Sequence, residues 1–165
     1  EAWAGYQARA FHGGAHAWHE LVTTGQAVPP KLVQYVENWL TWLIKFTADS
    51  GGVTPTEFPM ESVPVPVADD FTGHMTGLWL SGACCAWMAG SRVPRLQHFI
   101  EQCVDELKTH YVNTGIPSHV MNGCWSPGLR LDTGSDKTSN GMFFGFWAGE
   151  IMRGLGRYMT YCATR

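Results

Sequence analysis

The stretch FTGHMTGLWLSGACCAWMA, residues 71–89, decides the fold of this chain. Apolar or small residues recur along it at spacings of four and three, namely Phe71, Met75, Leu78, Gly82, Cys85 and Ala89. This spacing places them on one face of an α-helix. Asp69 and Asp70, directly before the stretch, are residue types that cap the first turn of a helix. The stretch therefore predicts a helix over residues 71–89.

Four further segments have the same helical periodicity. Before the central stretch, the periodic residues are Ala4, Ala8, Phe11, Ala15, Trp18 and Val22, ending at Thr24-Gly25, and then Val33, Val36, Leu40 and Leu43, starting at Pro29-Pro30 and stopping at Asp49. After it, they are Leu96, Ile100, Cys103, Leu107 and Tyr111, following Pro94, and Phe144, Ala148, Ile151, Leu155, Tyr158 and Cys162, where Ser139 is a suitable cap. We expect eight residues to be almost fully buried: Phe11, Trp18, Leu40, Leu78, Ile100, Leu107, Ile151 and Leu155.

The connections between these segments alternate between short and long. Residues 23–28 and 90–93 are short turns, which make the helices they join antiparallel neighbours. Residues 53–68 contain four prolines and cannot be helical, and residues 113–138 form a second long irregular loop. The sequence thus predicts an all-α domain of antiparallel helical hairpins with two long loops. Five glycines within the predicted helices, each costing up to about 1 kcal/mol relative to Ala, should permit close helix contacts: Gly73, Gly77, Gly82, Gly145 and Gly149.

This rhythm resembles the α/α toroid, an architecture shared by many glycoside hydrolases, polysaccharide lyases, terpenoid cyclases and lanthionine-synthetase-like proteins. The segment from Thr24-Gly25 through Trp39-Leu40 to Gly51-Gly52 is similar to one carbohydrate-active hairpin of that kind. The resemblance implies alternating inner and outer helices. Five helices are fewer than a typical ring of six hairpins needs. We therefore expect residues 1–165 to be a single helical domain that is a fragment or part of a larger toroid, or that other copies or another chain complete.

Composition narrows the classes of partner. The chain has 45% hydrophobic and only 15% charged residues, eight Trp and a net charge of −3. Its scattered Lys and Arg argue against nucleic-acid binding, and no apolar run reaches the roughly 18 residues of a membrane span. The low charge suggests that a partner covers part of the surface, or that glycines and hydroxyl residues face the solvent. Five Cys without a C-x-x-C pair predict neither a disulfide framework nor a zinc ribbon.

The first long loop is acidic. Glu57, Glu61 and Asp70 lie close in sequence to His74, and glycoside hydrolases use one carboxylic acid to protonate the leaving oxygen and a second as base or nucleophile. We predict Glu57 and Asp70 as this pair, with His74 orienting one of them and Glu61 contacting substrate. The competing interpretation is that Asp70 only caps the following helix and that the glutamates are ordinary loop charges.

Further candidates lie elsewhere along the chain. Trp125, in the second loop, and Trp79 are predicted to stack on a sugar ring, with His119 nearby; alternatively, Trp125 only fixes the loop onto the helices. His12, His16 and His19 share one helix face. Neutral imidazoles at this spacing can bind a metal. The Gly-Gly-Ala spacer, however, lacks the acidic base of the H-E-x-x-H motif. We therefore predict that the histidines form hydrogen-bonded packing contacts and that the chain binds no metal and no cofactor.

Two functional classes follow. The first is a carbohydrate-active toroid module, hydrolase-like or lyase-like, that acts on a polysaccharide through the acidic loop. The second is a non-catalytic structural subunit of a larger assembly, such as a virion or a multi-subunit complex, in contact with other protein chains or copies of itself. The sequence does not decide between an enzyme and a non-catalytic protein.

Overall fold

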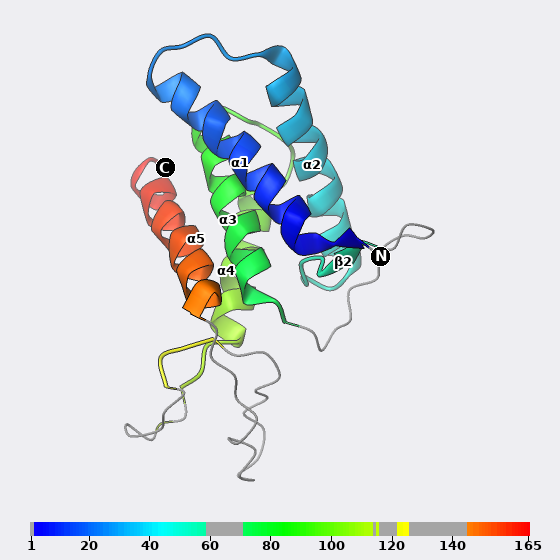
Figure 1. Cartoon of the computed structure of the whole chain (residues 1–165), viewed down its shortest axis with the longest axis vertical. Helices are drawn as coiled ribbons and strands as arrows, with labels where there is room; N and C mark the ends of the chain where they lie inside the picture. Colours follow the sequence, from blue (N-terminus) through cyan, green and yellow to red (C-terminus); the bar gives the residue numbers. More distant parts are fainter. Residues whose placement is uncertain (1, 59–70, 114, 116–121, 126–144) are drawn as a thin grey trace.

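A computed structural model of the 165-residue chain describes residues 2–58, 71–113, 115, 122–125 and 145–165, with side chains from residue 6 onward except those of 57 and 58. Five helices dominate these residues (Figure 1). They are α1 (Ala4–Thr23), α2 (Pro30–Asp49), α3 (Gly73–Met88), α4 (Leu96–Thr109) and α5 (Gly145–Ala163). Two short strands, β1 (Ala2–Trp3) and β2 (Glu57–Phe58), pair antiparallel. The predicted all-helical character is confirmed.

Local signals fix most of the helix ends. Gly25, with a positive φ of 68°, follows α1, and Pro30 is the first residue of α2, as the sequence indicates. The start of α3 differs from the prediction. Its N-cap is Thr72 and makes no side-chain cap hydrogen bond, so the helix begins two residues after Phe71. Asp70 and Ser139, the predicted caps, lie outside the described residues.

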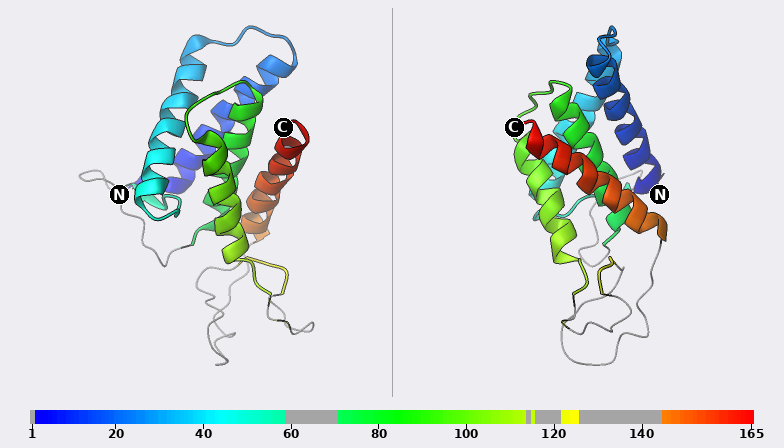
Figure 2. Two further views of the ribbon diagram at one scale, coloured as in Figure 1. Left: turned by 180° about the vertical axis from the view of Figure 1, so that it is seen from behind. Right: turned by 90° about the vertical axis from the view of Figure 1, so that its left-hand side faces the viewer.

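Helix α3 occupies the centre of the molecule. Every residue from 73 to 86 is buried, because α1, α4 and α5 all contact this helix. The views in Figures 1 and 2 show α1 and α5 as neighbours of α3, with α2 beside α1 and α4 on the far side. A helix that is apolar around its whole circumference is stable only when it is enclosed in this way. The composition of residues 71–89 therefore reflects a central position.

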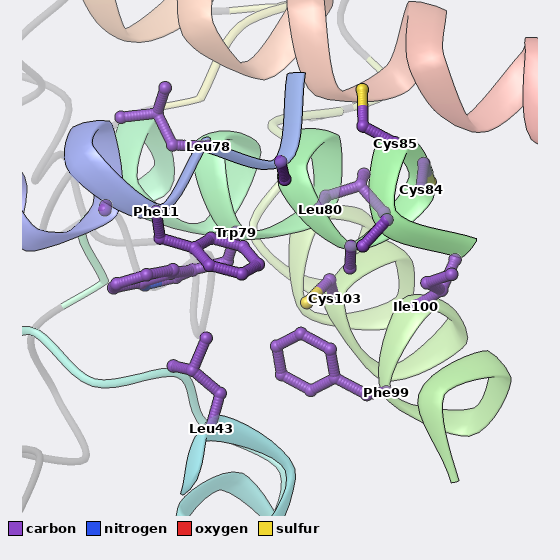
Figure 3. Packing of buried hydrophobic residues seen from close by; sticks show 14 of the residues in the cluster. Phe11, Leu43, Leu78, Trp79, Leu80, Cys84, Cys85, Phe99, Ile100 and Cys103 are labelled. Carbon is purple, nitrogen blue, oxygen red and sulfur yellow. The ribbon is translucent and has the colours of Figure 1, made fainter. Parts of the chain in front are cut away.

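The main core cluster draws side chains from all five helices, and Val112 and Cys124 form a small separate cluster. Figure 3 shows Trp79 and Leu80 of α3 between Phe11 of α1, Leu43 of α2 and Phe99 of α4. Of the eight residues predicted to be almost fully buried, all but Leu155 are buried, and Leu155 is partly exposed. The exposed positions Val22, Tyr111 and Cys162 were wrongly assigned to buried faces. Val22 and Cys162 lie in the last turns of their helices, and Tyr111 follows the end of α4.

Glycines allow α3 and α5 to approach each other very closely. A Cβ atom on Gly77 would lie 2.5 Å from the carbonyl oxygen of Glu150, and a Cβ on Gly154 would lie 2.5 Å from the carbonyl oxygen of Gly77. Gly82 makes a comparable contact with the Phe11 ring. The prediction of close contact is thus confirmed for α3 but wrong for Gly149, where a Cβ would meet nothing within 4 Å. On α5, Gly154 is the residue that contacts α3.

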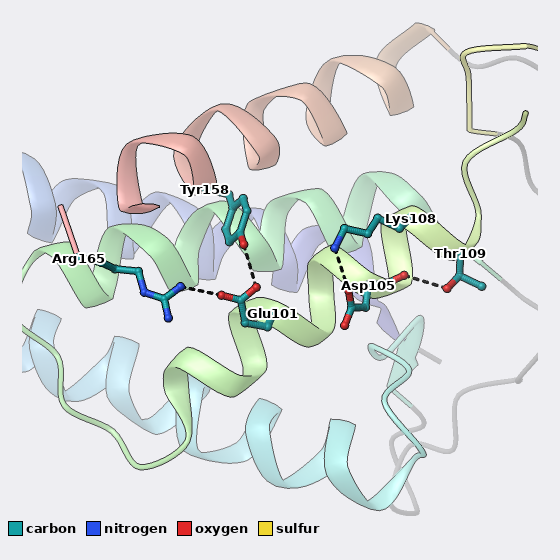
Figure 4. Close-up of polar contacts among 6 residues, drawn as sticks. All are labelled: Glu101, Asp105, Lys108, Thr109, Tyr158 and Arg165. Carbon is teal, nitrogen blue, oxygen red and sulfur yellow. Dashed lines mark hydrogen bonds and ion pairs between the residues drawn. The ribbon is translucent and has the colours of Figure 1, made fainter. Parts of the chain in front are cut away.

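Polar contacts attach α5 to α4 at the C-terminal end of the chain. The Glu101 carboxylate accepts hydrogen bonds from the Tyr158 hydroxyl at 2.8 Å and from the Arg165 guanidinium at 2.9 Å (Figure 4). The Lys108–Asp105 pair in the same view is exposed and lies within α4, so it contributes little to stability. None of the helices within the described ranges is long and apolar enough to cross a membrane.

Candidate functional site

The predicted acidic site falls largely outside the described part of the chain. Glu61, Asp70 and His119 are not described, and Glu57 is placed only by its backbone, opposite Trp3 in the strand pair. The catalytic pair of Glu57 and Asp70 therefore stays a prediction.

The two predicted site residues on α3 face the interior. His74 is buried in the first turn of α3, beside the rings of Phe146 and Trp147. Burial, with a smaller effect of the Arg9 guanidinium, lowers the pKa of His74 to about 4. Its imidazole is therefore neutral at neutral pH. Trp79 is completely buried and contacts the rings of Phe11 and Trp39, so within the described structure its ring presents no surface to a sugar.

Trp125 is held against the end of α4. Its indole N–H donates a hydrogen bond of 2.8 Å to the Leu107 carbonyl. Its backbone forms an antiparallel bridge with Tyr111, and the two rings meet edge to face. This geometry favours the interpretation that Trp125 fixes the second loop onto the helices. The neighbouring Cys124 is buried, which raises the pKa of its thiol and makes it a poor nucleophile.

A polar region lies where side chains of α1 and α5 meet beside α3. We call it the α1/α5 polar face. Its members are Arg9, His12, His16, His19 and Glu20 of α1 and Glu150, Arg153 and Arg157 of α5. Helical spacings of three and four bring each set onto one side of its helix. This arrangement turns the histidine row of α1 toward charged side chains of α5.

Two contacts join the two helices across this face. Arg9 lies 3.8 Å from the Glu150 carboxylate, which is also 3.4 Å from Arg153. Farther along, the Arg157 Nη2 atom lies 2.8 Å from the His16 Nε2 atom. A guanidinium only donates hydrogen bonds, so His16 Nε2 accepts this one. The Glu20 carboxylate lies 3.7 Å from the same nitrogen.

The electrostatic environment of the polar face is positive. Burial lowers the pKa of His12 to about 4, and Arg153, His16 and Arg157 act in the same direction. Burial and then Arg157 also lower the pKa of His19, against a weaker opposing effect of Glu20. These histidines are therefore neutral at neutral pH. The arginines supply positive charge that the two glutamates do not fully balance.

A metal ion does not suit this arrangement. In the described parts of the chain, no three His, Cys, Asp or Glu side chains lie together as a metal site would require. His12 and His16 have ring centroids 5.9 Å apart, but the space around them is shared with arginines, which repel a cation. That the histidine row binds no metal stays a prediction, and elemental analysis of the purified protein would test it.

A second buried polar group, unrecognised in the sequence, lies on α4. Glu106 accepts hydrogen bonds from the Thr54 backbone N–H and hydroxyl, both at 3.4 Å, and Thr54 in turn lies 3.0 Å from the Thr76 hydroxyl. Burial raises the pKa of Glu106 to about 7, although the Thr54 and Thr76 hydrogen bonds act against this shift. The carboxyl group joins α4, α3 and the segment after α2.

The sequence interpretation recognised the histidine row but missed its partners on α5. Glu150, Arg153 and Arg157 follow the same three-and-four spacing on an otherwise apolar helix, which was the available signal. Comparison with known proteins adds no assignment: no family model matches the sequence, and neither the curated proteins nor the solved structures give a match.

Proposed function

We propose that this chain is a non-catalytic interaction module, a segment of an α/α-toroid-like array of helical hairpins that assembles with a second copy of itself. The observation that carries the proposal is an apolar face of α5 that the described residues leave uncovered. Met152 and Met159, seven residues apart and therefore on one side of this helix, are 60% and 72% exposed. Large apolar side chains gathered on one exposed helix face are typical of a protein–protein contact.

The glycines between these side chains support the same proposal. Gly149 and Gly156 alternate with Met152 and Met159 along the exposed face, and a Cβ on either glycine would meet nothing within 4 Å. Each glycine costs a helix roughly 0.5–1 kcal/mol relative to Ala. Gly154, on another side of the same helix, serves the close contact with α3. A second helix packed against Gly149 and Gly156 would give these two glycines an equivalent role.

The proposed occupant is α1 of a second copy. Helix α1 exposes small residues at matching spacing, Ala10, Gly13 and Ala17, together with Tyr6, which is 72% exposed. A Cβ on Gly13 would also meet nothing within 4 Å. Helices α1, α3 and α5 are the glycine- and aromatic-rich helices of successive units, and α3 already packs between the other two. Docking α5 of one copy against α1 of the next would continue this row through a head-to-tail contact.

The experiment measures mass in solution by light scattering over a range of protein concentrations. We expect the wild-type chain to associate. A double variant with Met152→Asp and Met159→Asp blocks α5, and Gly13→Asp blocks α1 in space that is free within the chain. Each variant alone should be monomeric, whereas an equimolar mixture should form 1:1 dimers, because each variant keeps the surface that the other lacks.

The control and the contrary outcomes are specific. Val22→Asp changes an exposed apolar residue outside both faces, and it should associate like the wild type. Association of Gly13→Asp by itself would contradict the contact with α1. A wild-type chain that stays monomeric at several hundred micromolar would refute the proposal, since stable interfaces of standard size associate far more tightly.

A carbohydrate-active module is the second candidate. It is favoured by exposed aromatic rings near the polar face: Tyr6 lies three residues before Arg9, and Phe146 lies four residues before Glu150. Aromatic rings beside hydrogen-bonding groups suit a sugar. Under this proposal, Glu57 and Asp70 are the catalytic pair. Incubation with a panel of polysaccharides should then release shorter products, and Glu57→Gln should abolish their release; no product from any of them would end this candidate.

A further inference from the structure

We infer that the α1/α5 polar face binds an oxyanion, the chemical group shared by carboxylates, sulfates and phosphates, with Arg157 as its principal ligand and Arg153 and His12 as flanking donors. The inference is independent of self-association, because all the residues involved belong to one chain.

Arg157 is the starting point because no carboxylate pairs with it among the described residues. Its one hydrogen bond there is to the His16 Nε2 atom, at 2.8 Å. By contrast, Arg9 and Arg153 lie beside Glu150, and Arg165 beside Glu101. A guanidinium has five N–H donors, so Arg157 retains several for a ligand.

The position of Arg157 distinguishes it from an ordinary surface arginine. Its side chain is partly buried and reaches across to α1, whereas Arg95, which also has no carboxylate partner in the described structure, is exposed to water. A partly buried cation without a counter-charge is unfavourable. An anion bound at this point would offset that cost. The contact with His16 fixes the orientation of the guanidinium, so that less side-chain entropy is lost on binding.

The charges around Arg157 include a second guanidinium. Burial is the largest cause of the lowered pKa values of His12 and His19, and after burial Arg153 and Arg157 lower the pKa of His12 and Arg157 lowers that of His19. Below the face, the Cys85 thiol of α3 is uncharged, since burial raises its pKa to about 11. The contribution of the arginines to these shifts reflects positive charge, which stabilises an anion at the same place.

The two carboxylates of the face do not fill the site. Glu150 already lies beside both Arg9 and Arg153. The side chain of Glu20 is 51% exposed, and its nearest charged or titratable partner in the structure is His16 at 3.7 Å. The remaining donors are the planar fork of Arg157, the Arg153 guanidinium and the N–H of neutral His12. A planar fork matches two oxygens of one oxyanion, which gives the ligand class.

Nuclear magnetic resonance of the histidine imidazoles tests the inference. The protein is titrated at low ionic strength with inorganic phosphate, with inorganic sulfate and with glucuronate, and sodium chloride serves as the reference salt. We expect saturable shifts of the His12, His16 and His19 signals with at least one oxyanion and not with chloride. The pKa of His12 should rise from about 4 in the bound state, because the anion opposes the effect of the arginines.

Two variants make the result specific. Arg157→Gln removes the charge and the fork, and should weaken binding about tenfold or more, the usual effect of losing a charge-assisted hydrogen bond. The matched control Arg95→Gln should bind like the wild type. Binding of phosphate and sulfate but not of glucuronate assigns the site to phosphoryl or sulfate groups, and the reverse assigns it to carboxylates.

The inference is overturned by any of three results. These are the absence of saturable shifts with all three oxyanions, equal shifts with chloride, and unchanged affinity in a folded Arg157→Gln protein. Failure of self-association would leave all of these measurements valid, so the two proposals fail separately.

Discussion

Replacing Gly77 by Ala tests the close contact between α3 and α5 most directly. The new Cβ would lie 2.5 Å from the Glu150 carbonyl oxygen and 2.8 Å from the Ile151 Cα atom. Both are backbone atoms of α5, so no side-chain rotation can relieve the overlap. The two helices must separate along the largest interhelical contact of the described structure.

The expected magnitude follows from two opposing effects. Overpacking of a core costs roughly 1–3 kcal/mol, and we take about 3 kcal/mol because the obstacle is backbone. Removing a glycine from a helix returns up to about 1 kcal/mol. The free energy of unfolding should therefore fall by about 2 kcal/mol. For a chain of this size, that corresponds to a decrease in Tm of about 4–8 °C.

Thermal and urea unfolding followed by circular dichroism provide the measurement. Gly149→Ala is the matched control, because a Cβ there meets nothing within 4 Å in the same chain. It should stabilise the monomer by roughly 0.5–1 kcal/mol, raising Tm where Gly77→Ala lowers it. A Gly77→Ala protein as stable as the wild type would show that α3 and α5 do not pack at this distance.

Three further outcomes are expected. The folded-state pKa of Glu106, about 7, lies above its unfolded value. The folded protein therefore holds the proton more tightly, and the free energy of unfolding should decrease by up to roughly 3 kcal/mol as pH rises from about 4.5 to 7. Urea unfolding at several pH values should show this pH dependence in the wild type and not in Glu106→Gln. The same pH dependence in both proteins would contradict the raised pKa of Glu106. Ile100→Ala should lower the free energy of unfolding by about 2–5 kcal/mol, and Leu155→Ala should lower it clearly less because Leu155 is partly exposed. Equal losses of stability in calorimetry would contradict this difference in burial between the two residues. Tyr158→Phe, which removes a hydrogen bond to Glu101, should cost about 1 kcal/mol in urea unfolding, and no change would argue against that contact.

The sequence by itself determined the helices and most of the core. Periodicity, Pro30 at the start of α2 and Gly25 after α1 act through neighbouring residues, so they can be read without knowledge of the fold. The same holds for Phe11 and Leu40, whose buried sides follow from the phase of one helix. Val22 and Cys162 shared that phase but lie in terminal helical turns and are exposed.

Only the tertiary structure decided which polar groups meet. Arg157 contacts His16 across 141 residues of sequence, and Glu106 contacts Thr54 across 52. Periodicity gives the side of a helix on which a residue lies, but not the helix it faces. That second property depends on how closely the helices pack. The chain therefore showed a histidine row on α1, whereas the packing of α1 and α5 around α3 gave that row its arginines and made the face positive.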